Sequence, residues 1–125
     1  MERPGDKAFG ALAEQVAAEC LRKLGYRILE RNVRFRGGEL DLVAKQGDVL
    51  VFCEVKARRG QGSGEPGEAV DCRKRRKMAL LAMDYLRTHP ELSRLECRFD
   101  VVLLRQSESG WRSEVIPDAF RPGWE

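Results

Sequence analysis

Residues 39–56 have the pattern of a β-hairpin, in which a polar turn over residues 46–48 joins two apolar segments. The second segment, residues 49–56, is rich in β-branched side chains. Side chains alternate between the faces of a strand, so Glu54 and Lys56 share the face of Leu50 and Phe52. The second strand is therefore apolar on one face, and on the other face it ends with an acid and a base.

The order of the other segments places this hairpin in a mixed sheet. Apolar residues recur at helical spacing over residues 6–24, and Gly25 is a typical residue to end that helix. Residues 26–32 predict a short strand, residues 60–67 a loop, and residues 68–88 a helix that stops before Pro90. Further strands are predicted over residues 97–104 and 111–116. The order α-β-β-β-α-β-β predicts an α/β fold with a central mixed sheet flanked by helices, formed by one domain over residues 1–125.

Composition disfavours several classes of protein. The chain is 42% apolar and 34% charged, which is typical of a soluble globular domain. It has no apolar run long enough to span a membrane and no hydrophobic secretory segment near residue 1, so we expect a cytoplasmic protein with no membrane partner. Four scattered cysteines and a single histidine lack the usual spacing of a structural zinc site.

Basic residues gather in one part of the sequence. Between Lys56 and Lys77 there are eight basic residues against three acidic ones, a net charge of +5, whereas the whole chain carries +3. Such a concentration is what binding to the phosphates of a nucleic acid requires. The alternative is an ordinary solvated helix face.

The hairpin register brings two carboxylates close together. If the turn is symmetric about Gln46 and Gly47, Asp41 lies opposite Phe52, Glu39 lies opposite Glu54, and Asp41 is diagonal to Glu54 on one face. Converging carboxylates beside a lysine are typical of a divalent-metal site in which a water acts as the nucleophile. The alternative is a cross-strand salt bridge of Glu54 with Lys56 or a nearby arginine.

Each helix contributes one further candidate. Glu14 lies at the edge of the apolar stripe of the first helix, where an ordinary boundary glutamate is the alternative. Lys74 lies on the buried side of the second helix, so its ammonium must either extend to solvent or find an anion. Glu68, Asp71 or a bound phosphate could supply it.

Several motifs resemble the bacterial YraN-like family, in order and at the right spacing over nearly the whole chain. They are Gly10-x3-Glu14-x2-Ala17, Gly25-Tyr26, Asn32, residues 38–43, residues 51–58, Ala69-Val70-x3-Lys74, residues 98–102 and Ala119-Phe120. This family looks like the PD-(D/E)XK nuclease superfamily and is close in layout to the archaeal Holliday-junction resolvases. The restriction-endonuclease-like αβββαβ core of that superfamily agrees with the predicted order.

The resemblance implies a metal-dependent nuclease site. Asp41 and Glu54 would bind Mg²⁺ or Mn²⁺, and Lys56 would be the catalytic lysine. The helix glutamate of the superfamily maps onto Glu14, and the basic residue of the second helix maps onto Lys74. Three positions depart from the family pattern: no proline precedes Asp41, Cys53 replaces an aliphatic residue, and Ser63-Gly64 stands where an aromatic-glycine pair is common.

The sequence therefore supports three functional hypotheses. The first is an endonuclease that cuts DNA, with branched or structured DNA as the substrate that the resemblance implies and with Glu39 as an accessory acid. Its phosphate-binding residues would be Arg58, Arg59, Arg73, Lys74, Arg75 and Lys77. The second is a nucleic-acid-binding module without turnover in a repair, recombination or uptake complex. The third is an interaction protein whose polar corner is a salt-bridge cluster. The residues leave the oligomeric state open, and a homodimer is suggested only by analogy with the resolvases.

Overall fold

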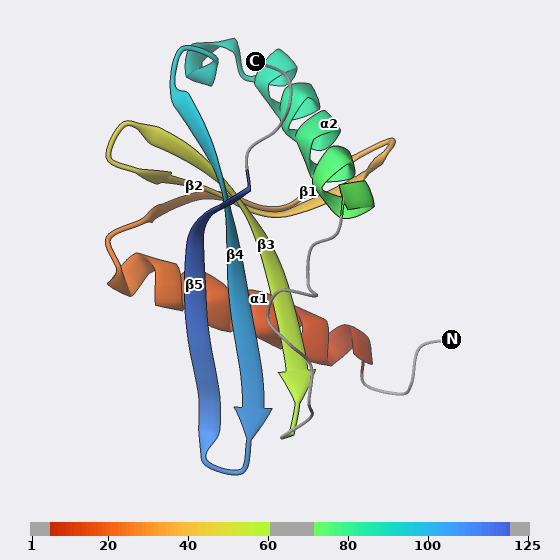
Figure 1. Cartoon of the computed structure of the whole chain (residues 1–125), viewed down its shortest axis with the longest axis vertical. Coiled ribbons are helices and arrows are strands. Elements are labelled where there is room, and N and C mark those ends of the chain that lie inside the picture. The colour runs from red at the N-terminus through yellow and green to blue at the C-terminus, as the bar shows by residue number, and fades with distance from the viewer. Residues whose placement is uncertain (1–5, 61–71, 121–125) are drawn as a thin grey trace.

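The computed structural model describes residues 6–60 and 72–120 of the chain. Its elements are, in order, α1 (Asp6–Lys23), β1 (Arg27–Phe35), β2 (Gly38–Gln46), β3 (Val49–Arg59), α2 (Cys72–Thr88), the 3₁₀ helix η2 (Pro90–Leu92), β4 (Glu96–Ser107) and β5 (Gly110–Phe120). The five strands form one sheet in the order β1-β2-β3-β4-β5 (Figure 1). Strands β3 and β4 are parallel, and the other neighbouring strands are antiparallel. The predicted mixed sheet with flanking helices is confirmed.

Most strands are longer than the sequence predicts. Strand β1 continues to Phe35, β4 continues to Ser107, and β5 continues to Phe120. The β3–β4 ladder extends through the Arg58–Arg105 and Arg59–Gln106 pairs. Main-chain pairing needs no apolar side chain, so a strand can continue where the hydrophobic pattern has ended. The predicted start of the second helix at residue 68 lies outside the described residues.

The sheet has an apolar core on each face. One core joins α2 to Leu50 and Phe52, and the other joins α1 to Val51 and Cys53. The predicted alternation along β3 is therefore confirmed, and it places Glu54 and Lys56 on the face that α2 covers. Each fully buried side chain of this size stabilises the fold by about 1.5–3 kcal/mol through the hydrophobic effect.

No helix within residues 6–60 and 72–120 is both long enough and apolar enough to span a membrane. All four cysteines are free, and Cys53 is fully buried in the core that α1 covers, whereas Cys72 is exposed at the start of α2.

Candidate active site

The β2–β3 ladder ends beside Asp41 and Glu54. It runs from the Gln46–Val49 pair to the Leu42–Cys53 pair, and Asp41 and Glu54 are the next residues on the two strands. At this point Oδ2 of Asp41 accepts a hydrogen bond from the main-chain N–H of Val55 at 2.9 Å. A side-chain carboxylate thus takes the place of a main-chain acceptor where the hairpin opens.

The register of the hairpin differs by two residues from the predicted one. Val43, and not Asp41, is the partner of Phe52. The predicted pairs of Asp41 with Phe52 and of Glu39 with Glu54 are therefore wrong. By continuation of the observed ladder, the residue across from Glu54 is Asp41 itself.

The conformation of the turn explains this register. The two turn residues are Gly47 and Asp48, one position later than predicted, and Gly47 has a φ of +60°. A glycine at the first turn position adopts this conformation without steric cost. A shift of two residues leaves the paired residues 42–46 on their predicted faces, and Asp41 remains a neighbour of Glu54 at the end of the ladder.

Asp41 lies where the alternation of β2 is interrupted. Leu40 packs in the core under α2, whereas Leu42 packs in the core under α1. Residues two positions apart on a regular strand share a face, so the chain changes faces between them. At this position Asp41 is close enough to Glu54 of β3 and Glu14 of α1 for their negative charges to act on it.

Three carboxylates form a compact group at this point. One ligand oxygen from each of Glu14, Glu39 and Asp41 lies within 4.8 Å of the others, and all three residues are half-buried. Glu39 also accepts a hydrogen bond from Nε of Arg34 at 3.0 Å. The sequence prediction treated Glu39 as an accessory acid, and the structure places it within the carboxylate group.

Burial and repulsion between carboxylates raise the pKa values of Asp41 and Glu14. Burial, followed by the negative charge of Glu54, raises the pKa of Asp41 to about 7, although the Val55 N–H and Lys74 act in the opposite direction. Burial and the charge of Glu39 likewise raise the pKa of Glu14 above its usual value. The site thus holds negative charge that a bound cation would stabilise.

Asp41 should therefore destabilise the metal-free protein at neutral pH. A raised pKa in the folded state means that stability is lost as the pH rises from about 4 to about 7, because deprotonation is less favourable in the folded than in the unfolded protein. At pH 8 in EDTA we expect Asp41→Asn to increase the free energy of unfolding by on the order of 2–4 kcal/mol. Urea denaturation at pH 5 and pH 8 measures the effect. Asp48→Asn, in the exposed turn, is the control, and an equal gain in both variants would contradict this prediction.

Glu54 is neutralised by two lysines rather than included in the carboxylate group. Its side chain is buried, with 5% of the residue exposed. Oε1 of Glu54 lies 2.9 Å from Nζ of Lys74 and 3.9 Å from Nζ of Lys56. Lys74 does pair with an anion, and Glu54 of β3 is one such partner. The predicted partners Glu68 and Asp71 lie outside the described residues.

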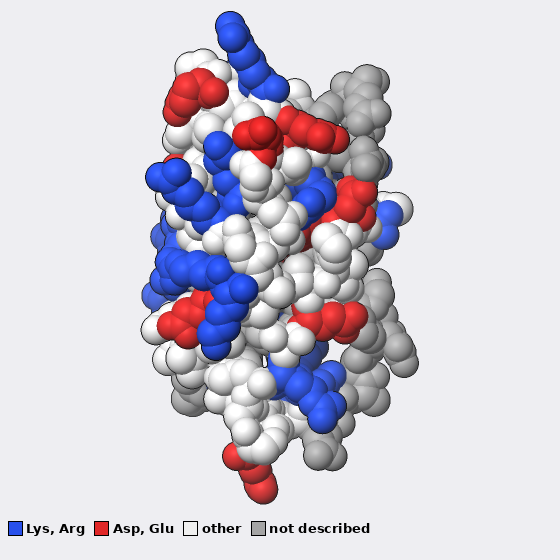
Figure 2. Space-filling model, turned by 90° about the vertical axis from the view of Figure 1, so that its left-hand side faces the viewer, with Lys and Arg blue, Asp and Glu red and all other residues white. Residues whose placement is uncertain are grey.

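The predicted phosphate-binding residues lie on β3 and α2. Arg58 and Arg59 end β3, and the guanidinium of Arg59 lies over the ring of Phe9, 4.2 Å from its centroid. Arg73, Arg75 and Lys77 are exposed near the start of α2. On the face seen in Figure 2, by contrast, basic and acidic side chains are interspersed.

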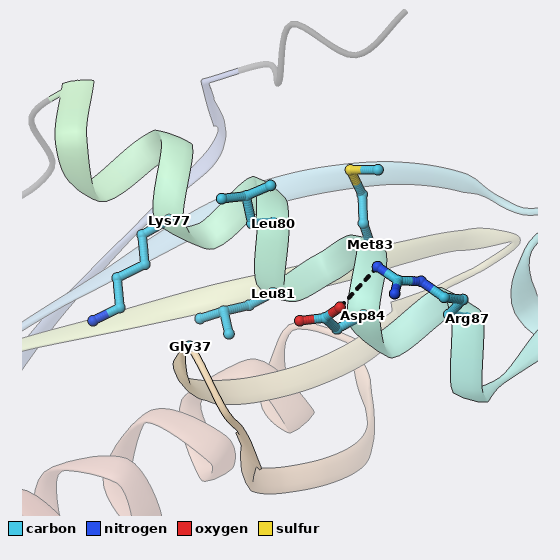
Figure 3. A pocket seen from close by; sticks show the side chains of 7 residues that line it. All are labelled: Gly37, Lys77, Leu80, Leu81, Met83, Asp84 and Arg87. Carbon is cyan, nitrogen blue, oxygen red and sulfur yellow. Dashed lines mark hydrogen bonds and ion pairs between the residues drawn. The ribbon is translucent and has the colours of Figure 1, made fainter.

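A separate groove of about 290 Å³ lies between α2 and the β1–β2 turn. Figure 3 shows its lining residues, which are Gly37, Lys77, Leu80, Leu81, Met83, Asp84 and Arg87. The aliphatic part of Lys77 lies against Gly38, where an added Cβ would come within 2.7 Å of its Cε atom. Any side chain at residue 38 would therefore displace Lys77.

The sequence prediction missed a buried network around Asp100, on the face of the sheet that α1 covers. Asp100 of β4 pairs with Cys53 and has no exposed surface. Its carboxylate accepts hydrogen bonds from the Tyr26 hydroxyl at 2.7 Å and from Nε of Arg98 at 2.9 Å. Burial and this carboxylate raise the pKa of Tyr26. An aspartate within an otherwise apolar strand was the signal for such a network.

The mixed five-stranded sheet with its two helices is consistent with a restriction-endonuclease-like core. The model of the family described as "Uncharacterised protein family UPF0102" matches residues 13–104. The chain belongs to this family, which is the YraN-like family that the motifs indicate and which is in the PD-(D/E)XK nuclease superfamily.

Relatives in three bacteria match most of the chain. A UPF0102 protein of Magnetococcus marinus is 48% identical over 94% of this chain and 95% of its own length. A UPF0102 protein of Symbiobacterium thermophilum is 52% identical over 91% of this chain and 97% of its own. A UPF0102 protein of Xanthomonas campestris pv. campestris is 48% identical over 90% of both chains.

Among solved structures, Pyrococcus furiosus SfsA in complex with Ca²⁺ matches with a TM-score of 0.31 and 19% identity. The match covers 89% of this chain but only 60% of the SfsA chain. This TM-score is too low to support a functional comparison.

Proposed function

We propose that this protein is a divalent-metal-dependent endonuclease that hydrolyses phosphodiester bonds in DNA, with branched or otherwise structured DNA as its substrate. The observation that carries the proposal is the convergence of acids from three elements where the β2–β3 hairpin opens. Asp41 is their centre, because Glu14 of α1 and Glu54 of β3 both act on its charge. Membership of the nuclease superfamily supports the same conclusion.

The donor set fits Mg²⁺ or Mn²⁺. These ions prefer carboxylate oxygens and retain water among their ligands. We assign Asp41 and Glu54 as the principal ligands and Glu14 and Glu39 as the acids that complete the site. The raised pKa of Asp41 fits this assignment, since a cation would offset the repulsion that causes it. When bound, a divalent ion polarises the phosphodiester and favours deprotonation of the attacking water.

Lys56 and Lys74 would have different roles. The Lys56 ammonium is partly exposed and lies 3.9 Å from Oε1 of Glu54, which suits it to donate to a phosphate oxygen or to orient the water. Lys74 is closer, at 2.9 Å, and would hold the Glu54 carboxylate in place. A direct contact between Lys74 and DNA stays a prediction.

The remaining cations would bind the phosphates on either side of the cut. Arg58 and Arg59 continue β3 beyond Lys56, and Arg73, Arg75 and Lys77 follow the start of α2 around Lys74. The two elements that position Glu54 thus also carry the exposed basic residues. Contacts to phosphates fix the position of DNA without reading its sequence.

Removing two of these charges should weaken binding and its dependence on salt. For Arg73→Gln/Lys77→Gln we expect the slope of log affinity against log salt to fall by about two, or about one per lost phosphate contact. Fluorescence anisotropy in EDTA measures binding without cleavage. The control is Arg22→Gln/Lys23→Gln, which removes two exposed charges at the end of α1. Equal slopes for the two double variants would exclude this part of α2 as the DNA-binding surface.

One observation favours binding without turnover as the alternative function. Lys74 already neutralises Glu54, so the buried acid has a partner without any metal. Cleavage of a labelled four-way junction, a matched duplex and a single strand, in Mg²⁺, Mn²⁺ and EDTA, distinguishes the two functions. Metal-dependent cutting that is lost in Glu54→Gln/Lys56→Ala would support the nuclease. Equal binding by both proteins without cutting would support the binding module.

A further inference from the structure

Asn32 has a conformation that few residues tolerate. Its φ is +54°, and among the described residues only one other non-glycine residue, Asp118, has a positive φ. This left-handed conformation costs most residues about 1 kcal/mol or more, and asparagine is among the residues that adopt it most readily. Strained positions of this kind are concentrated at functional sites.

The position of Asn32 in the sheet is next to Asp41. Strand β1 pairs Arg31 with Leu42 and Val33 with Leu40, so Asn32 and Asp41 are the residues between these two pairs. Both strands depart from regular alternation of buried and exposed side chains near this step. Residues 30–32 are all exposed, which breaks the alternation of β1, and β2 changes faces at Asp41.

The side chain of Asn32 connects this irregular step to α1. Its amide acts on the carboxylate of Glu14 and lowers the pKa of that acid, and a Glu14 oxygen lies within 4.8 Å of one of Asp41. Arg31, the preceding residue, adds a positive charge near Glu14. The side chains of Asn32, Glu14 and Asp41 therefore come together where α1, β1 and β2 meet.

A neutral amide is suited to this position. A lysine or arginine in contact with Glu14 would compete with a metal ion for its negative charge. An amide N–H donates to one lone pair of the carboxylate and leaves the others available. Partners that orient a metal-binding carboxylate in this way typically change metal affinity by about 10–100-fold.

We propose that Asn32 is a positioning residue of the metal site, in which its left-handed backbone directs the side-chain amide to Glu14 and holds that carboxylate beside Asp41. This inference rests on the proposed function, because it requires a divalent ion at these acids. It adds a residue that contacts the ion only through Glu14.

The role of Asn32 is tested by isothermal titration calorimetry, in which Mn²⁺ is added to the full chain without DNA. Asn32→Gly permits the same backbone conformation and removes only the side-chain amide. We expect the Mn²⁺ dissociation constant of this variant to rise about tenfold. Its metal-free melting temperature should stay close to that of the unaltered protein. Asp118→Gly is the matched control, because it removes a side chain from the other left-handed position, whose N–H binds Asp100.

The outcomes separate the inference from the function on which it rests. Unchanged Mn²⁺ affinity in Asn32→Gly would overturn the role of Asn32 alone. Weaker binding that accompanies a lower melting temperature, or an equal loss in Asp118→Gly, would also overturn it, since either result indicates a general structural effect. Failure of the unaltered protein to bind Mn²⁺ would overturn the metal site and this inference together.

Discussion

Glu54→Gln is expected to reduce metal-dependent cleavage of DNA by on the order of 10³-fold without weakening the binding of DNA. The substitution keeps the shape of the side chain and removes the charge that we assign to the metal. It also releases Lys74 and Lys56 from the carboxylate that neutralises them. The positive potential near the scissile phosphate should then increase, so the dissociation constant for DNA should stay equal or decrease.

Single-turnover cleavage and anisotropy on the same labelled DNA measure the two effects of Glu54→Gln. Glu19→Gln is the matched control, because Glu19 is an exposed glutamate of α1. Cleavage by Glu54→Gln at the rate of the control would remove Glu54 from the catalytic site. Weaker DNA binding by Glu54→Gln than by the control would show that Glu54 supports the structure of the DNA-binding surface instead.

Asp100→Ala is expected to lower the free energy of unfolding by about 3–5 kcal/mol, the usual cost of removing one partner of a buried ion pair. Asp100 accepts hydrogen bonds from Tyr26, from Arg98 and from the main-chain N–H of Asp118. Its removal leaves Arg98, whose side chain is 20% exposed, and the Tyr26 hydroxyl without this acceptor. Gln46 would remain as the other acceptor for Arg98.

Urea denaturation in EDTA measures the effect of Asp100→Ala independently of metal binding. Asp84→Ala is the control, because Asp84 pairs with Arg87 on the exposed surface of α2 at 2.8 Å. Exposed pairs of this kind contribute about 0–1 kcal/mol. A loss in Asp100→Ala as small as that in Asp84→Ala would show that the buried network contributes little to stability.

Several of the candidate residues could be selected from the sequence because their signals are local. Glu54 and Lys56 interrupt a strand pattern at a spacing of two, and Lys74 interrupts a helix pattern, so each is visible without knowledge of the fold. Glu14 could be placed only at the edge of its helix, and the structure adds its contact with Asp41. The importance of Asp100 was not recognised, because one acid in a strand does not reveal its partners.

The sequence by itself determined the order of the elements, the two faces of β3 and the unusual place of Lys74 on the buried side of its helix. These properties follow from the periods of helices and strands, which neighbouring residues encode. The tertiary structure alone decided that Lys74 pairs with Glu54, that Glu39 joins Glu14 and Asp41, and that Asn32 lies beside them. Such partners come from elements far apart in the chain, and their distances depend on strand register and helix placement. In the hairpin, a turn centred one position later, at a glycine with a positive φ, shifts the register by two residues. The hydrophobic pattern cannot detect this shift, because the paired residues keep their faces.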